Sequence, residues 1–330
     1  MLALLGAALI ALAALGAAAV ALLLMPELRA APAAWMERQL FPDANTVNLV
    51  GGGKARAAGP PRSVFRVLAF GDSLTEGFTD GGNAFHPYAK RLGDRLYPEM
   101  PKGWHLEIEE QGESGERVLL GMRHRLQRTL DEHAAAARHY DWVLLLAGIN
   151  DLAGNESTPA EVAAGLDVLV QACLAHGAHV LLMTLMEVAQ PEPGVEAARA
   201  ALNDLLRDYV SQRAWDKGAA PGGSAGGGAP APLPAPAAAA ARGGGGGGAP
   251  TPVARRGAPA VHLFDLAAAL PFQGLPEEQR WQLWDDGVHL TMAGYDHLGG
   301  LVADALLPLV DHELQDQPAL GGGAADKKRS

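Results

Sequence analysis

The chain has 330 residues, of which 48% are hydrophobic and 19% are charged, which suffices for one sizeable α/β domain with additional segments. The formal net charge is −11 and the basic residues are scattered, so the sequence lacks the clustered basic face that nucleic-acid binding needs. The single cysteine, Cys173, excludes an intramolecular disulfide and lies in an apolar helical pattern, where we expect a buried thiol. No Cys/His cluster has metal-ligand spacing, and we expect neither a metal nor another cofactor.

The N-terminal segment, residues 2–25, is apolar throughout and ends at Pro26. A run of about 20 apolar residues can cross a bilayer, whereas a secretory signal usually has a shorter apolar core, about 7–15 residues, after a basic start. No Lys or Arg precedes this run, so we expect a membrane anchor and a membrane-associated protein. A signal that is cleaved on the secretory pathway is the alternative. Residues 26–62 are rich in Ala, Pro and Gly and predict a tether before the folded domain, which we place at residues 63–312.

Within this domain, short apolar runs alternate with longer helical patterns. Strands are expected at residues 64–70, 105–109, 142–147, 180–185 and 261–265. Helices are expected from residue 86, and at residues 117–137, 159–177, 195–215 and 291–310. Between the first strand and the first helix, residues 78–85 predict a polar loop. The helical spacing also assigns Leu119 and Leu205 to buried faces.

A repeated strand–helix order predicts a three-layer α/β/α sandwich around a five-stranded parallel sheet. Residues 217–259 interrupt the pattern and consist almost entirely of Gly, Ala and Pro, which predicts a disordered insertion. Because the insertion connects a helix to a strand, it should leave the domain at the amino ends of the strands. Residues 313–330 predict a disordered tail.

Distinctive turns follow the first, second, third and fifth strands. They carry Ser73, Gly115, Asn150 and the pair Asp286 and His289, respectively. The carboxyl ends of parallel strands meet at one edge of a sheet, so these residues are expected to share one cleft.

The residue types in these turns fit acyl transfer. A serine hydroxyl needs a base to become a nucleophile, and His289 can accept the proton of Ser73 while Asp286 orients the imidazole. The negative charge on the substrate carbonyl oxygen needs preorganised donors, and the N–H groups of Ser73 and Gly115 and the side-chain amide of Asn150 are suitable. Asp285 is a neighbour that could compete with Asp286, and Asp72 is expected to brace the turn.

The order of these turns resembles the four sequence blocks of the GDSL/SGNH hydrolase family. The blocks are Gly71-Asp72-Ser73-Leu74, Ser114-Gly115, Gly148-x-Asn150-Asp151 and Asp286-x-x-His289. Each block alone is a weak motif, but all four in order are specific. The family often has an asparagine a few residues before the second-block glycine, where this chain has Glu110-Gln111.

The resemblance implies the flavodoxin-like SGNH hydrolase fold, with the nucleophile at Ser73, the acid and base at Asp286 and His289, and oxyanion donors at Ser73, Gly115 and Asn150. It implies hydrolysis of a carboxylic ester, as in esterases and lipases, through an acyl-serine intermediate and without a cofactor. The substrate would be a small-molecule, lipid or sugar ester.

Three alternatives stay open at this point: a carbohydrate O-acetyl esterase, a thioesterase and a non-catalytic flavodoxin-like binding module. Trp281 and Trp284 fit an acyl pocket and a core position equally well. The physiological substrate and the oligomeric state do not follow from the sequence.

Overall fold

The computed structural model describes residues 63–101, 104–153, 157–189, 194–218 and 258–315. The predicted anchor at residues 2–25 and the predicted tether at residues 26–62 lie outside these ranges, so both stay predictions. Within the described ranges, no helix combines the length and the apolar character needed to cross a bilayer.

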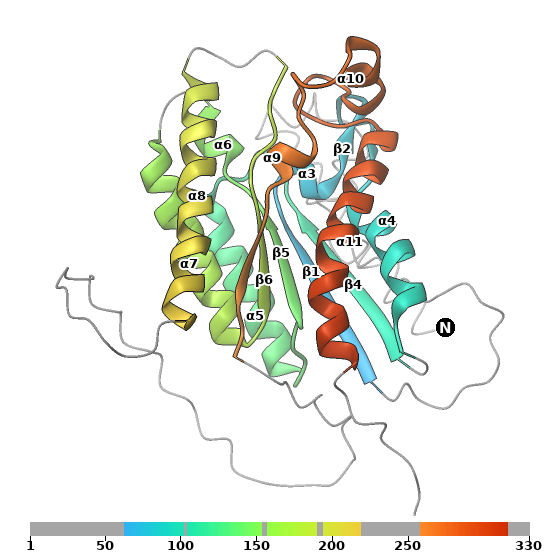
Figure 1. The fold of residues 1–330 in the computed structure, drawn as a ribbon, viewed down its shortest axis with the longest axis vertical. Coiled ribbons are helices and arrows are strands. Elements are labelled where there is room, and N and C mark those ends of the chain that lie inside the picture. The colour runs from blue at the N-terminus through green and yellow to red at the C-terminus, as the bar shows by residue number, and fades with distance from the viewer. Residues whose placement is uncertain (1–62, 102–103, 154–156, 190–193, 219–257, 316–330) are drawn as a thin grey trace, which may run out of the picture.

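Five parallel strands form a single sheet in the order β4-β1-β5-β6-β7 (Figure 1). The strands are β1 (Ser63–Gly71), β4 (Trp104–Gly112), β5 (Trp142–Leu146), β6 (His179–Met183) and β7 (Val261–Phe264). Every residue of β5 is buried, because helices cover both faces of the sheet and a continuous apolar run suits that position. In the centre, Leu68 of β1 pairs with Glu109 of β4 on one side and with Val143 of β5 on the other.

Helices form the two outer layers of the sandwich (Figure 1). One layer contains α4 (Tyr88–Leu96) and α11 (Met292–Gln315), which pack on each other. The other contains α5 (Arg123–Ala135), α7 (Pro159–His176) and α8 (Val195–Gly218). The predicted three-layer α/β/α fold with a five-stranded parallel sheet is confirmed.

Several short elements occur where the sequence predicts loops. Residues 78–85 form a small hairpin of β2 (Phe78–Thr79) and β3 (Ala84–Phe85) instead of an irregular loop. The other short elements are helices. They are the one-turn helices η3 (Asp80–Gly82), η4 (Tyr97–Glu99), α3 (Ser73–Glu76), α6 (Ile149–Leu152) and α9 (Leu266–Ala269), and the longer α10 (Glu277–Leu283). All but α10 are too short to show a helical or strand period, so the sequence pattern misses them.

The predicted buried faces are wrong at two leucines. A π-helical turn, η5 (Val118–Met122), precedes α5, and its extra residue shifts the helical phase. Val118 therefore occupies the core position with 3% exposure, and Leu119 is 42% exposed. Leu205 of α8 is 39% exposed, because the buried face of α8 runs through Leu202 and Leu206.

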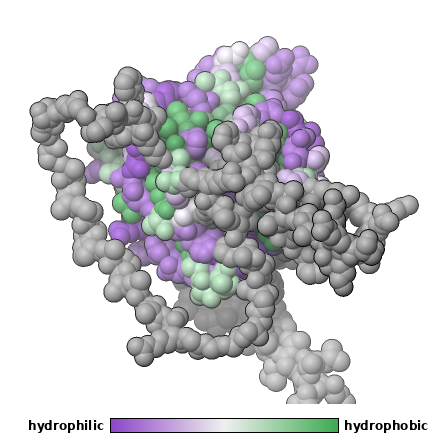
Figure 2. Space-filling view, turned by 60° about the horizontal axis from the view of Figure 1, so that its bottom comes forward, coloured by the Kyte–Doolittle hydropathy of each residue, from purple (hydrophilic) through white to green (hydrophobic). Residues whose placement is uncertain are grey.

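The connections to the predicted insertion lie at the amino ends of the strands. Helix α8 continues to Gly218, two residues into the predicted insertion, and the described chain resumes at residue 258 before β7. Both points lie at the lower edge of the sheet in Figure 1, whereas α3, α9 and α10 lie at the upper edge. Seen toward this lower edge, the visible surface has hydrophilic areas around smaller hydrophobic ones (Figure 2).

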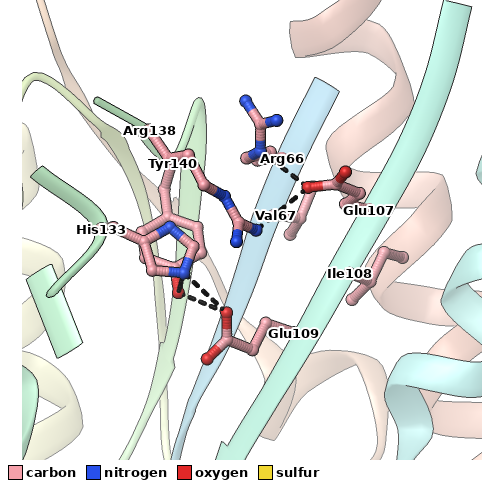
Figure 3. A pocket seen from close by; sticks show the side chains of 8 residues that line it. All are labelled: Arg66, Val67, Glu107, Ile108, Glu109, His133, Arg138 and Tyr140. Carbon is pink, nitrogen blue, oxygen red and sulfur yellow. Dashed lines mark hydrogen bonds and ion pairs between the residues drawn. The ribbon is translucent and has the colours of Figure 1, made fainter. Parts of the chain in front are cut away.

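A small polar pocket lies between β1, β4 and the end of α5 (Figure 3). At its centre the Glu109 carboxylate accepts hydrogen bonds from Tyr140 Oη at 2.6 Å and Gln111 Nε2 at 2.8 Å, and it pairs with His133 Nε2 at 3.0 Å. Burial alone would raise the Glu109 pKa, but the bonds from His133, Tyr140 and Gln111 outweigh it and lower the pKa from 4.5 to about 2. The ionised Glu109 carboxylate therefore stabilises the fold at pH values above 4.5, the ordinary pKa of a glutamate.

We predict a pH-dependent stability difference between the parent protein and Glu109→Gln. The depressed pKa means that the stabilisation is complete above about pH 4.5 and is lost as the pH falls through about 2. At pH 7 the variant should be less stable by roughly 1–3 kcal/mol, and the difference should narrow below pH 4.5. Urea unfolding between pH 7 and pH 3 measures this. Glu132→Gln, at an exposed position of α5, is the control. A stability difference between Glu109→Gln and the parent that is constant with pH would contradict the assignment.

Residues 219–257 should be replaceable by a Gly-Ser linker of about 12 residues. Loop-closure entropy changes by only about 0.6 kcal/mol per doubling of length, so stability should be equal or slightly higher. Thermal unfolding measures the stability, and hydrolysis of a small soluble ester measures kcat/KM, which should be nearly unchanged. A tenfold or larger loss of kcat/KM in a variant that still unfolds cooperatively would show that the insertion reaches the active site.

Candidate active site

The turn after β1 presents Ser73 at the carboxyl edge of the sheet. Asp72 caps the one-turn helix α3, because its Oδ1 accepts a 3.0 Å hydrogen bond from the Leu74 N–H, as expected for a bracing residue. A Cβ on Gly71 would lie 2.1 Å from the Leu146 carbonyl oxygen, so only glycine allows this strand end to approach β5. Burial raises the pKa of Asp72 to about 7, although the bond from Leu74 opposes this shift.

Ser73, His289 and Asp286 form a continuous hydrogen-bonded chain. The His289 imidazole lies with Nε2 2.9 Å from Ser73 Oγ and Nδ1 2.7 Å from Asp286 Oδ2. Since the Asp286 carboxylate is an acceptor, Nδ1 carries the proton and Nε2 is left to accept the proton of the serine. The predicted trio is therefore brought together in space.

Asp286 is held as an ionised acceptor. Its Oδ1 accepts the N–H groups of Val288 at 2.9 Å and His289 at 2.7 Å. Burial opposes ionisation, but the bonds from the His289 ring and from these two N–H groups outweigh it and lower the Asp286 pKa. The competing neighbour Asp285 is occupied elsewhere, because its Oδ2 accepts the Asp80 N–H at 2.7 Å.

The loop that carries the histidine is fixed from two sides. On one side, the Ala189 N–H donates to the Gly287 carbonyl at 2.7 Å, and Gly287 has a left-handed φ of 86°. On the other side, the Phe78 ring lies 4.4 Å from the His289 ring, centre to centre. The Phe78 carbonyl accepts the Tyr295 hydroxyl at 2.8 Å, which ties the hairpin to α11.

The predicted oxyanion donors lie on three different turns. Within the described part of the chain, neither the Ser73 N–H nor the Gly115 N–H donates a hydrogen bond, so both remain available to a substrate. Gly115 is exposed and has a φ of 76°, a conformation that favours glycine. Asn150 donates from Nδ2 to the Glu116 carbonyl at 3.1 Å, which orients its amide beside the Gly115 turn.

The sequence does not predict two residues that support the turns of the site. Glu76, which is 1% exposed, accepts hydrogen bonds from Ser114, the residue before Gly115. Arg125, which is 7% exposed, donates to the carbonyl oxygens of Gly71 and Gln111, both at 2.7 Å. The sequence signals for these roles are a charged residue directly after the serine turn and an arginine beside the apolar positions of a helix.

Trp281, Trp284 and Cys173 are the remaining residues that the sequence singles out. Trp284 is 1% exposed and its ring lies 5.1 Å from Phe272, so it belongs to the core, whereas Trp281 is 50% exposed. Cys173 is buried, as predicted, and burial raises its pKa to about 12. Among the residues that the structure describes, no group of three His, Cys, Asp or Glu side chains could hold a metal ion.

Comparisons with known proteins give one family match. Residues 69–220 match the model of the GDSL-like Lipase/Acylhydrolase family, a range that contains the first three blocks and ends before Asp286 and His289. Similar solved structures include an inhibitor-bound aryl esterase from M. Smegmatis, with 20% identity over 74% of this chain and 99% of that chain and a TM-score of 0.46. A carbohydrate esterase family 3 protein from Talaromyces cellulolyticus has 15% identity over 75% of this chain and 99% of that chain, with a TM-score of 0.47. A carbohydrate acetylesterase family member from Sinorhizobium meliloti has 19% identity over 76% and 99%, also with a TM-score of 0.47. A search of curated proteins gives no match to this sequence.

Gly287→Ala should destabilise the protein. A Cβ at this position would lie 2.6 Å from the Ala189 Cβ, and the residue would be held at a φ of 86°. We expect a loss of roughly 1–3 kcal/mol in thermal or urea unfolding, the range for a non-glycine residue in this conformation. Gly300→Ala is the matched control, since a Cβ there meets no atom within 4 Å and alanine favours a helix. Equal stability of Gly287→Ala and the parent would contradict the described loop geometry.

Proposed function

We propose that this ester hydrolase domain, which matches the GDSL-like lipase/acylhydrolase family, cleaves carboxylic esters. The reaction would proceed through an acyl-enzyme intermediate on Ser73. The observation that carries this proposal is the hydrogen-bonded chain from Ser73 Oγ through His289 to Asp286, with distances of 2.9 and 2.7 Å. Hydrogen-bonded contact between a nucleophile, a base and an orienting carboxylate is the requirement for activating a serine.

In the acylation half-reaction, His289 Nε2 takes the proton of Ser73 as Oγ attacks the carbonyl carbon of the ester. The resulting oxyanion is stabilised by the free N–H groups of Ser73 and Gly115 and by the Asn150 amide. When the tetrahedral intermediate collapses, the bond to the alkoxy group breaks and His289 returns the proton to the leaving alcohol. Asp286 stays ionised and stabilises the imidazolium that forms in between.

In the deacylation half-reaction, His289 deprotonates a water molecule that attacks the acyl carbon on Ser73. The same three donors stabilise the second oxyanion. Cleavage of the bond to Oγ releases the carboxylic acid, and the proton held by His289 returns to Ser73. No step of this sequence needs a cofactor.

The substrate class within ester hydrolysis is open to direct measurement. The family match does not support the alternative of a non-catalytic flavodoxin-like binding module. Carbohydrate O-acetyl esters and thioesters use the same nucleophile and the same oxyanion donors, so both belong in a substrate panel beside aryl esters of increasing acyl length. Attachment to a membrane through residues 2–25, with secretion after cleavage as the alternative, stays a prediction.

Ser73→Ala and His289→Ala should each lower kcat on an aryl acetate by several orders of magnitude. The double variant should be little worse than either single variant, because the residues act as one unit. Asn150→Ala should cost roughly 10²–10³-fold, the scale of one oxyanion donor. Steady-state kinetics measure these effects, and labelling of the parent, but not of Ser73→Ala, by an organophosphate identifies the nucleophile. Near-parent turnover in both single variants would rule out the proposal.

A further inference from the structure

We infer that Glu76 is a positioning residue for the oxyanion-binding turn, an inference that rests on the function proposed above. Glu76 lies three residues after Ser73, at the end of α3, and its side chain is almost completely buried, with 1% exposure. Its carboxylate reaches across from the nucleophile turn to the turn after β4. The two turns that must bind one substrate oxygen are thereby joined by a single side chain.

Two hydrogen bonds make this connection. Glu76 Oε2 accepts the Ser114 N–H at 2.9 Å, and it also accepts the Ser114 hydroxyl in a short hydrogen bond. Because one oxygen receives both donors, it fixes the main chain and the side chain of Ser114 together. Burial strengthens such hydrogen bonds, because the local dielectric is low and water does not compete for the donors.

The residue that follows Ser114 explains why this fixation matters. Gly115 provides an N–H with no internal partner among the described residues, and a Cβ built on it would meet no atom within 4 Å. Neighbouring side chains therefore do not hold Gly115 in place by packing. The orientation of its N–H depends on the residues before and after it.

Both flanks of Gly115 are tied down, by different elements. On the far flank, the Glu116 carbonyl accepts the Asn150 amide at 3.1 Å. On the near flank, the Glu113 N–H donates to the Gly71 carbonyl and the Glu113 carbonyl accepts the Glu116 N–H, both at a longer 3.2 Å. The Glu113 carboxylate lies 3.5 Å from Arg125, and Glu76 binds Ser114. Glu76 is thus the acceptor that holds Ser114 on the near flank, and it does so from the same one-turn helix that carries Ser73.

Gly112, the last residue of β4, shows how closely the two turns approach. A Cβ on Gly112 would lie 2.1 Å from the Glu76 main-chain nitrogen and 2.8 Å from the Asp72 carbonyl oxygen. The turn after β4 therefore rests directly on α3, and the Glu76 side chain closes the contact. The Glu76 side chain acts on the oxyanion site through Ser114 and Gly115, which makes it a positioning residue and not a catalytic one.

The test compares kcat and KM of Glu76→Ala, Glu76→Gln and Ser114→Ala on an aryl acetate. Oxyanion interactions act mainly in the transition state, so Glu76→Ala should lower kcat by about 10–100-fold with KM changed by less than about threefold. Glu76→Gln keeps a carbonyl acceptor for Ser114 and should recover most of kcat. Ser114→Ala loses one of the two bonds and should fall between the parent and Glu76→Ala.

Glu109→Ala is the control, since Glu109 is a partly buried, hydrogen-bonded carboxylate that lines the pocket between β1, β4 and α5. It should lower the unfolding temperature and leave kcat at 25 °C near that of the parent. Equal kcat losses in Glu76→Ala and Glu109→Ala would reduce the effect to general destabilisation and overturn the inference. If Glu76→Ala does not fold, a kcat for Ser114→Ala within about twofold of the parent would overturn it equally, since a lost donor costs far more.

The inference and the proposed function fail separately. Full activity of Ser73→Ala would refute the proposed function and, with it, the inference. An inactive Ser73→Ala together with near-parent kcat in Glu76→Ala and Ser114→Ala would refute the inference alone.

Discussion

The candidate active site depends on one buried cation, the guanidinium of Arg125. It donates to the last carbonyl of β1, at Gly71, and to the Gln111 carbonyl near the end of β4, and it forms an ion pair with Glu116. It also lies 4.0 Å above the centre of the Phe70 ring. A buried charge is tolerable only when its donors are satisfied, and here the acceptors are the ends of two neighbouring strands. The spacing between the nucleophile turn and the oxyanion turn is therefore set below the site, before any substrate contact.

The same cation connects to the third turn through Glu116. The Glu116 carboxylate pairs with Arg125, and its carbonyl accepts the Asn150 amide. A residue with no direct part in the proposed chemistry thus holds two turns in register. Such charge-assisted networks cost several kcal/mol when one member is removed, because the remaining charge is left buried without a partner. Precision at the edge of the sheet is maintained by these polar contacts, while the apolar core sets the strand order.

The sequence predicts the fold well because its signals are local. A continuous apolar run such as Trp142–Leu146 is typical of a strand covered on both faces, and the turn after it carries a recognisable residue in Asn150. Ser73 and His289 are 216 positions apart, yet the rule that parallel strands end at one edge is enough to predict their meeting. The resemblance to the family blocks adds the prediction that Ser73 is the nucleophile and His289 the base.

What the sequence does not predict depends on tertiary contact. The burial of Glu76 and Arg125 is decided by main-chain carbonyls and N–H groups that only the folded sheet brings near them. Phe78 reads as a loop residue, because a hairpin with two-residue strands has no period, and its place against His289 follows from packing on α11. Leu119 fails for a related reason: a single π-helical turn changes the helical phase, and the Val118 and Leu119 main chains bond to buried Asp151 instead of following α-helical spacing.

The separation of the two sheet edges has a consequence for how such a domain can be joined to other segments. Strand β1 begins, α8 ends, β7 begins and α11 ends at the edge opposite to Ser73 (Figure 1). The long undescribed segments therefore join the domain at one edge of the sheet, and Ser73 lies at the other edge, with the length of the strands between them. Residues can be gained, lost or exchanged at the junctions with residues 1–62, 219–257 and 316–330 without changing the edge of the sheet that carries Ser73. A long N-terminal extension, a Gly/Ala/Pro insertion and a C-terminal extension can thus accumulate on one domain while selection on the reaction acts elsewhere.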